Sequence, residues 1–161
     1  MAAVPAAEPV VVEFDETRRA PVVRRMARMA DARAGWINLS PGLDVEEPPP
    51  PRSVLGSLFS ARGPTVPLAT WAPAQGRDPA TIGIEHGQGP RVVKTLADKD
   101  AAVPPGWRVT QDNPRRGLVV IPKPAATDQE LDAVLAWLLR AAGALCPVPR
   151  SGQWRAYCYE V

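Results

Sequence analysis

The chain holds few of the residues from which catalytic and metal centres are usually built. One histidine, His86, and two cysteines, Cys146 and Cys158, stand among 161 residues. They form neither a C-x-x-C pair nor a histidine cluster, so we predict no metal site and no cofactor. Two cysteines are also too few for a disulfide framework, and we expect both to behave as small buried hydrophobic residues.

Strong net charge and long apolar runs are also missing. Lys and Arg number 19 against 17 for Asp and Glu, and the net charge of +2 gives no long-range field that would by itself attract nucleic acid. No apolar run approaches the ~20 residues of a membrane helix, and the first residues lack the pattern of a signal peptide. We therefore expect a cytoplasmic protein without a membrane partner, and the abundance of Ala, Arg and Pro is typical of bacteria with GC-rich genomes.

The composition predicts a folded α+β protein. Hydrophobic residues make up 45% and charged residues 22%, which is the balance of a globular chain. The 20 prolines must lie in loops and at the ends of elements, because proline lacks a backbone donor. We divide the chain into two small halves, 1–77 and 78–161, which share a core if they form one fused domain.

The C-terminal half contains the clearest helix. Thr127 and Glu130 form a capping box, and leucines, valines and alanines at three- and four-residue spacing follow up to Pro147, so we predict a helix over 128–145. A second helix begins at Pro90. Four strands complete this half, at 81–85, 107–112, 117–121 and 154–161. The resulting β-α-β-β-α-β order predicts a ferredoxin-like antiparallel sheet with both helices on one face.

The N-terminal half reads as an abbreviated version of the same unit. Its predicted elements are a strand at 10–14, a helix at 21–34, a strand at 36–39, a proline-rich loop at 44–52, a short helix at 53–60 and a strand at 66–71. The spacing from Val22 to Trp36 is within one residue of that from Val92 to Trp107. This similarity indicates a degenerate internal repeat, although any two units of this kind would show comparable spacing.

One strand predicts a further layer of structure. The segment 118–121 is apolar at every position, so side chains on both faces of the sheet require burial. The helices cover one face. We expect the N-terminal half to pack on the other, with the same surface of a second copy as the alternative.

A glycine-containing loop between strand 81–85 and the next helix is a candidate site for a small anion. Backbone N–H groups at the start of a helix attract negative charge. The candidate ligand-binding residues are His86, Gly87, Gln88, Gly89 and Arg91. The alternative is that the glycines only permit a tight turn and that His86 is a surface or packing residue.

An arginine-rich segment is a candidate nucleic-acid site. Arginines on one helix face bind phosphates, and a hairpin tip could extend the patch. The candidate residues are Arg18, Arg24, Arg25, Arg28, Arg115 and Arg116. The alternative is a solvated helix face whose arginines pair with Asp31, Glu8, Glu13 and Asp15. The central strands lack the stacked aromatics of common RNA-binding sheets, which argues against a conventional RNA surface.

Five tryptophans are available for packing or recognition. Most are expected in the core, but Trp137 lies at the edge of the apolar stripe of the long helix, as either a partner-binding anchor or a core residue.

Because groups suited to proton transfer are scarce, our leading prediction is a non-enzymatic interaction module that binds another protein or a second copy. The alternatives are nucleic-acid binding by the arginine helix and a ligand-binding or enzymatic site at 85–90.

Overall fold

The computed structural model describes residues 7–45 and 63–161 and confirms a mixed α+β protein. Its strands are β1 (Val10–Asp15), β2 (Trp36–Leu43), β3 (Leu68–Ala72), β4 (Thr81–Glu85), β5 (Arg108–Asn113), β6 (Gly117–Ile121) and β7 (Arg150–Tyr159). Its helices are α1 (Ala20–Ala32), α3 (Val92–Asp98) and α4 (Asp128–Ala144). All the strands join one antiparallel sheet, in the order β1-β7-β2-β3-β4-β6-β5.

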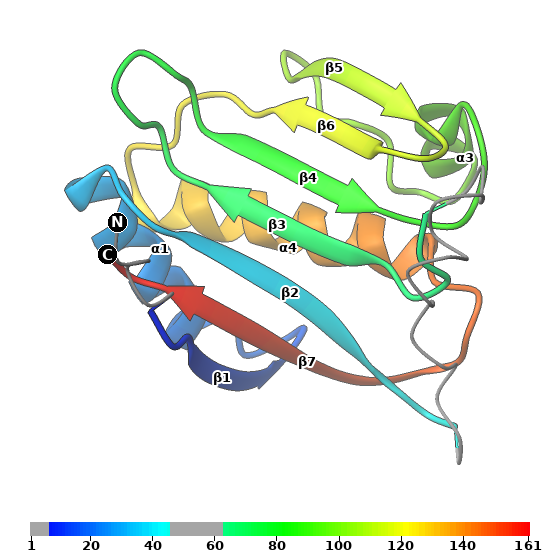
Figure 1. The fold of residues 1–161 in the computed structure, drawn as a ribbon, viewed down its shortest axis with the longest axis horizontal. Helices are drawn as coiled ribbons and strands as arrows, with labels where there is room; N and C mark the ends of the chain where they lie inside the picture. Colours follow the sequence, from blue (N-terminus) through cyan, green and yellow to red (C-terminus); the bar gives the residue numbers. More distant parts are fainter. Residues whose placement is uncertain (1–6, 46–62) are drawn as a thin grey trace, which may run out of the picture.

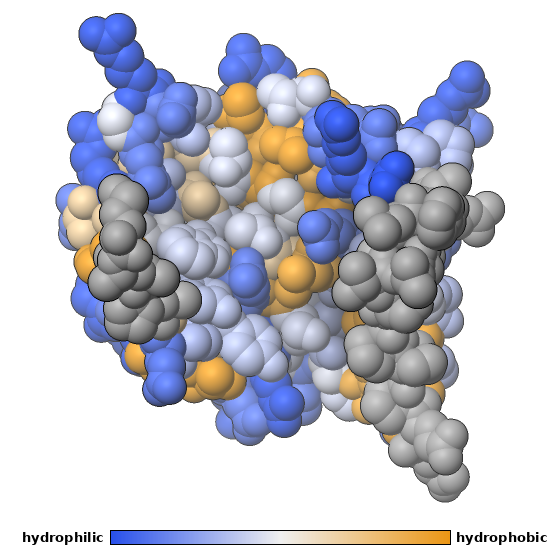
Figure 2. All heavy atoms as spheres, viewed as in Figure 1, coloured by the Kyte–Doolittle hydropathy of each residue, from blue (hydrophilic) through white to orange (hydrophobic). Residues whose placement is uncertain are grey.

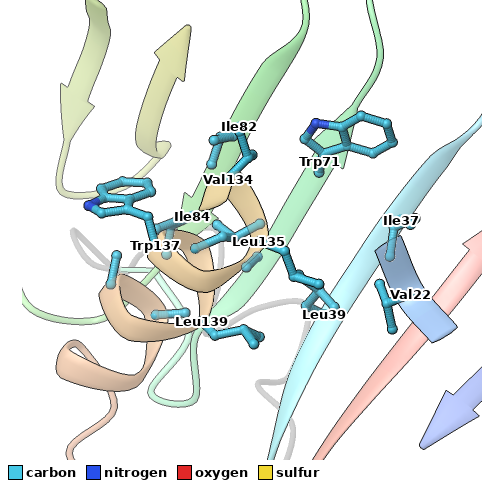
Figure 3. Packing of buried hydrophobic residues seen from close by; sticks show 14 of the residues in the cluster. Val22, Ile37, Leu39, Trp71, Ile82, Ile84, Val134, Leu135, Trp137 and Leu139 are labelled. Atoms are coloured by element: carbon cyan, nitrogen blue, oxygen red, sulfur yellow. The ribbon is translucent and has the colours of Figure 1, made fainter. Parts of the chain in front are cut away.

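The core lies between this sheet and the two longer helices. In Figure 1, α1 and α4 lie behind the sheet, and α1 packs beside α4. Buried side chains alternate along β2, β3, β4 and β7 and line up across strands, so that Ile37 lies opposite Trp71, and Trp71 opposite Ile82. Figure 3 shows Leu135 and other α4 side chains among these sheet residues. The sheet face on which these buried apolar residues lie is therefore the face that α1 and α4 cover.

The start of α4 confirms the predicted capping box. The Thr127 hydroxyl accepts a hydrogen bond from the Glu130 N–H at 3.2 Å, and the Glu130 carboxylate accepts one from the Thr127 N–H at 3.0 Å. Backbone N–H donors also lower the pKa of Glu130, because they stabilise its charged form. The helix then buries its apolar stripe against the sheet. Local sequence therefore fixes where this helix begins.

The strand order differs from the predicted ferredoxin-like sheet. In that layout the strand at 154–161 would pair with the strand at 81–85. Instead, β7 lies between β1 and β2, with Tyr157 opposite Val11 on one side and Asn38 on the other. The strands β2 and β3 therefore separate β7 from β4. Both edges of β7 are occupied by strands of the N-terminal half, so the four later strands form no sheet of their own.

The order does contain two similar units. The strands β1 and β2 are both antiparallel to β7, which lies between them, and β4 and β5 are both antiparallel to β6. Each unit is thus a strand, a helix and a second parallel strand with one antiparallel strand inserted. The internal repeat itself stays a prediction.

The described part of the N-terminal half does not cover the second face of the sheet, which corrects our expectation for these residues. Its strands extend the same sheet, and α1 lies on the same side as α4 (Figure 1). On β6, Leu118 and Val120 are buried, whereas Val119 and Ile121 are half-buried on the far side. Ile121 lies opposite Arg108, whose aliphatic stem can shield an apolar neighbour. Most of the loop expected at 44–52 and all of the helix expected at 53–60 lie outside the described residues.

Candidate functional site: the open face of the sheet

We call the sheet face turned away from α1 and α4 the open face, and none of the described helices lies on it. The strand registers place one row of residues across it, which consists of Val119, Gly83, Thr70, Asn38, Tyr157 and Val11. Figure 2 views this face and shows apolar surface where β4 and β6 run, with more polar surface towards β2 and β3. The open face therefore combines apolar and polar groups, as protein interfaces do.

An aromatic cluster lies at the end of this face where β2 begins and β7 ends. The rings of Trp36 and Tyr159 stack with centroids 4.7 Å apart and an interplanar angle of 12°. Trp36 is 40% exposed, and Val11, which pairs with Tyr157, is 48% exposed. Large aromatic side chains with this exposure provide much of the binding energy at interfaces. We define this aromatic cluster as Val11, Trp36, Tyr157 and Tyr159.

A hollow of about 500 Å³ adjoins the aromatic cluster, between β2 and β7. Its wall includes Ser40, Gln153 and Arg155, together with Tyr157. The Arg155 guanidinium donates a hydrogen bond to Glu13 at 3.1 Å. The side chains of Tyr157 and Glu13 raise the pKa of Arg155, so its charge is fixed. Such a wall suits a polar side chain of a docking partner.

The middle of the open face is ordered but carries little side-chain volume. The Thr70 hydroxyl donates a hydrogen bond to the Asn38 side-chain oxygen at 2.9 Å. This bond links polar side chains of the neighbouring strands β3 and β2. A Cβ added at Gly83 would meet no atom within 4 Å. The surface is therefore recessed at Gly83, with open space for side chains of another molecule.

The loop predicted to hold an anion is occupied by a carboxylate of the protein. The Asp112 carboxylate, from β5, accepts hydrogen bonds from the N–H groups of Val92 and Val93 at 3.1 Å each. These are the first N–H groups of α3, so the charge that the helix start attracts comes from Asp112. Gly87 and Gly89 lie in the preceding turn, where Gly89 has a positive φ of 85°. The side chain of Arg91 is exposed, and its backbone adopts the left-handed conformation at φ 59°.

His86 is fully buried beside this turn rather than presented to solvent. Its Nδ1 accepts a hydrogen bond from the Gln88 N–H at 3.2 Å, and within the described residues its Nε2 has no hydrogen-bond partner. Burial lowers the pKa of His86, and the charge of Asp112 partly opposes this effect. A neutral ring with one bonded nitrogen is therefore expected here.

Three of the six arginines of the predicted nucleic-acid site form ion pairs within the described residues. Arg18 pairs with Asp15, and both Arg25 and Arg28 pair with Glu160. Of the expected partners Asp15 is thus confirmed, while Glu13 pairs with Arg155 from β7. Arg24 is exposed on α1.

The hairpin arginines do not extend this patch. Arg115 and Arg116 lie in the turn between β5 and β6, at the opposite edge of the sheet from β1 and α1 (Figure 1). The structure thus separates the two groups of arginines that the sequence had suggested as one surface.

Trp137 faces the core and offers no surface to a partner. It is 1% exposed, and its indole N–H donates to the carbonyl oxygens of Ala101 and Ala102 at 3.2 and 2.9 Å. Its ring meets that of Trp107 edge to face at 5.2 Å. The aromatic cluster, by contrast, was missed as a site, although the alternation of Tyr157 and Tyr159 about Cys158 already placed both tyrosines on one strand face.

Two further observations concern the described residues alone. They contain no group of three or more His, Cys, Asp and Glu side chains that is close enough to hold a metal ion. They also contain no helix that is both long and apolar enough to cross a membrane.

Comparison with known proteins adds no further assignment. No family model, no curated protein and no solved structure matches the chain.

Proposed function

We propose that the protein is a non-enzymatic interaction module that uses the open face of its sheet, and that its partner is a second copy of the chain. The observation that carries this proposal is the apolar and aromatic composition of a sheet face on which no described helix packs. Exposed apolar groups that cluster on one face mark interaction sites more often than isolated ones do. The described strands of the N-terminal half extend the sheet instead of covering it, which favours a second copy as the cover.

The charges of the open face favour self-association over a strongly charged partner. Glu13 and Arg155 form a pair within it, while Glu85 on β4 and Arg108 on β5 bring one further charge of each sign. The two copies therefore face each other with surfaces of balanced charge, and no large repulsion between like charges opposes their association. A two-fold axis across the sheet also lets the same patch serve both copies. The two unpaired thiols agree with a cytoplasmic setting for this module.

The test is the oligomeric state of the full chain, measured by light scattering and sedimentation. We expect a dimer that Gly83→Arg converts to a monomer, because the new side chain projects from the recessed centre of the open face. Ala133→Arg is the matched control, since it adds the same side chain at an exposed position of α4. Circular dichroism checks that both variants fold.

Two results would contradict the proposal. One is a strictly monomeric wild-type protein at about 100 µM, well above the micromolar dissociation constants of modest complexes. The other is a dimer that Ala133→Arg disrupts as strongly as Gly83→Arg, since the contact would then lie on the helical side.

A further inference from the structure

A second hollow lies on the helical side of the molecule and has a different chemistry. It measures about 420 Å³ and is lined by charged side chains from four parts of the chain, with a floor of small and aliphatic α4 residues. The charged residues are Glu16, Arg19, Lys99, Arg140 and Arg150. We refer to it as the cationic hollow. Its volume falls within the range of small-molecule sites.

Two of the four cations are neutralised within the protein. Arg19 makes a two-point contact with Asp132 on α4, at 2.8 Å for each hydrogen bond. Arg150 donates to Glu16 at 2.7 Å, and the Trp154 indole N–H donates to the same carboxylate oxygen at 3.2 Å. These contacts hold the side chains in place and leave no net charge from either pair.

Lys99 and Arg140 supply the remaining positive charge. Neither pairs with a carboxylate among the described residues, so the hollow carries two uncompensated cations. Lys99 donates one hydrogen bond to the carbonyl oxygen of Ala144 at 3.0 Å, which positions its ammonium at the end of α4 and leaves further donors free. Arg140 is exposed on α4, and no other described residue forms a salt bridge with its guanidinium, which can therefore contact a ligand.

The start of α1 and a glycine of α4 shape the wall of the hollow. Arg19 is the N-cap residue of α1, and no described side chain caps this helix start. Gly143 brings the Arg150 guanidinium close to α4, because a Cβ built there would lie 2.7 Å from the guanidinium carbon.

We propose that the cationic hollow binds a small soluble molecule that carries a phosphate group, with Lys99 and Arg140 as the direct donors. A phosphate carries nearly two negative charges at neutral pH, which matches the two uncompensated cations. A small hollow with only two uncompensated cations suits a compact ligand better than a nucleic acid, which needs a row of phosphate contacts. This site shares no residue with the open face and does not depend on the proposed dimer.

The experiment titrates the full chain with inorganic phosphate and with pyrophosphate by calorimetry, at ionic strength held constant with sodium chloride. We expect saturable binding that Lys99→Gln and Arg140→Gln each weaken about tenfold, the loss of one charge-assisted hydrogen bond. Arg108→Gln is the matched control, because it removes one exposed arginine at the far edge of the sheet. It should leave the affinity unchanged.

A second variant tests the geometry without removing a charge. Gly143→Ala keeps every cation but displaces the Arg150 guanidinium, which lines the hollow, and we expect the altered wall to weaken phosphate binding with an unchanged circular dichroism spectrum. The proposal is overturned if no heat beyond the chloride control is seen, or if Arg108→Gln weakens binding as much as Arg140→Gln. Tighter binding of a DNA oligonucleotide, weakened by Arg24→Gln but not by Arg140→Gln, would overturn it as well.

Discussion

The contact between Asp112 and α3 makes a quantitative prediction about stability. The helix has seven residues, too few to be stable in isolation, so it depends on tertiary contacts. Asp112 closes its first turn with two hydrogen bonds, and removal of a capping side chain costs about 0.5–2 kcal/mol. Because both bonds go to a charged acceptor, we expect Asp112→Ala to lower the free energy of unfolding by about 2 kcal/mol.

The upper limit follows from what α3 buries. Val92 and Leu96 are 1% and 0% exposed, and full exposure of two such side chains costs about 3–6 kcal/mol. A loss in that range would mean that the whole helix melts. Asp112→Asn keeps one acceptor oxygen but loses the charge, so we expect about half the effect of alanine.

Urea unfolding followed by circular dichroism measures these differences, and thermal unfolding gives an independent value. For a chain of this length, 2 kcal/mol corresponds to a fall in Tm of roughly 4–8 °C. Asp98→Ala is the control, since it removes an exposed carboxylate from the last turn of the same helix. A loss below about 0.5 kcal/mol for Asp112→Ala, or one equal to that of Asp98→Ala, would refute the capping argument.

Two further predictions concern the buried titratable groups. Because burial lowers the pKa of His86 in the folded state, the unfolded chain takes up its proton first, and stability should fall as the pH drops below 6.5 until the folded pKa is reached. His86→Gln should flatten this part of a plot of unfolding free energy against pH, and parallel plots for the two proteins would contradict the assignment. Burial also raises the pKa of Cys158 to about 11, so only the half-buried Cys146 should react readily with a thiol reagent such as DTNB at pH 8 in the native protein. Equal rates for both thiols, measured with Cys146→Ser as the reference, would show that Cys158 is accessible.

Local signals in the sequence predicted individual elements well. Thr127 and Glu130 lie three residues apart, so the capping box needs no knowledge of the rest of the fold. The start of β6 at Gly117 follows from a short hairpin in the same way. Features that depend on neighbours within a few residues were therefore accessible.

Long-range pairing was not accessible, and both corrections to the fold have this cause. The alternation in β7 shows which residues share a face, but it does not show whether β1, β2 or β4 lies alongside. The all-apolar segment 118–121 suggested a second layer, whereas Val119 and Ile121 stay half-buried beside polar neighbours of β5.

The candidate sites likewise depend on contacts between residues that are far apart in the sequence. The cap on α3 comes from Asp112, about twenty residues further along the chain, so the glycine loop alone could not reveal that its anion position was taken. The cationic hollow combines residues from the start of α1, the end of α3, α4 and β7, and no short sequence window contains two of its cations.

The position of β7 links the topology to the proposed binding surface. In the described sheet β1 has β7 as its one neighbour, so β1 is joined to the rest of the sheet only through the last strand. Closing a loop of nearly the whole chain carries a large entropy cost, which makes this pairing a late step of folding. The aromatic cluster takes its residues from β1, β2 and β7, whereas β4, β5 and β6 pair with near neighbours in the sequence. The proposed binding surface therefore exists only in the completed sheet, and we expect a fragment without β7 to lose it even if the β4-β6-β5 unit folds.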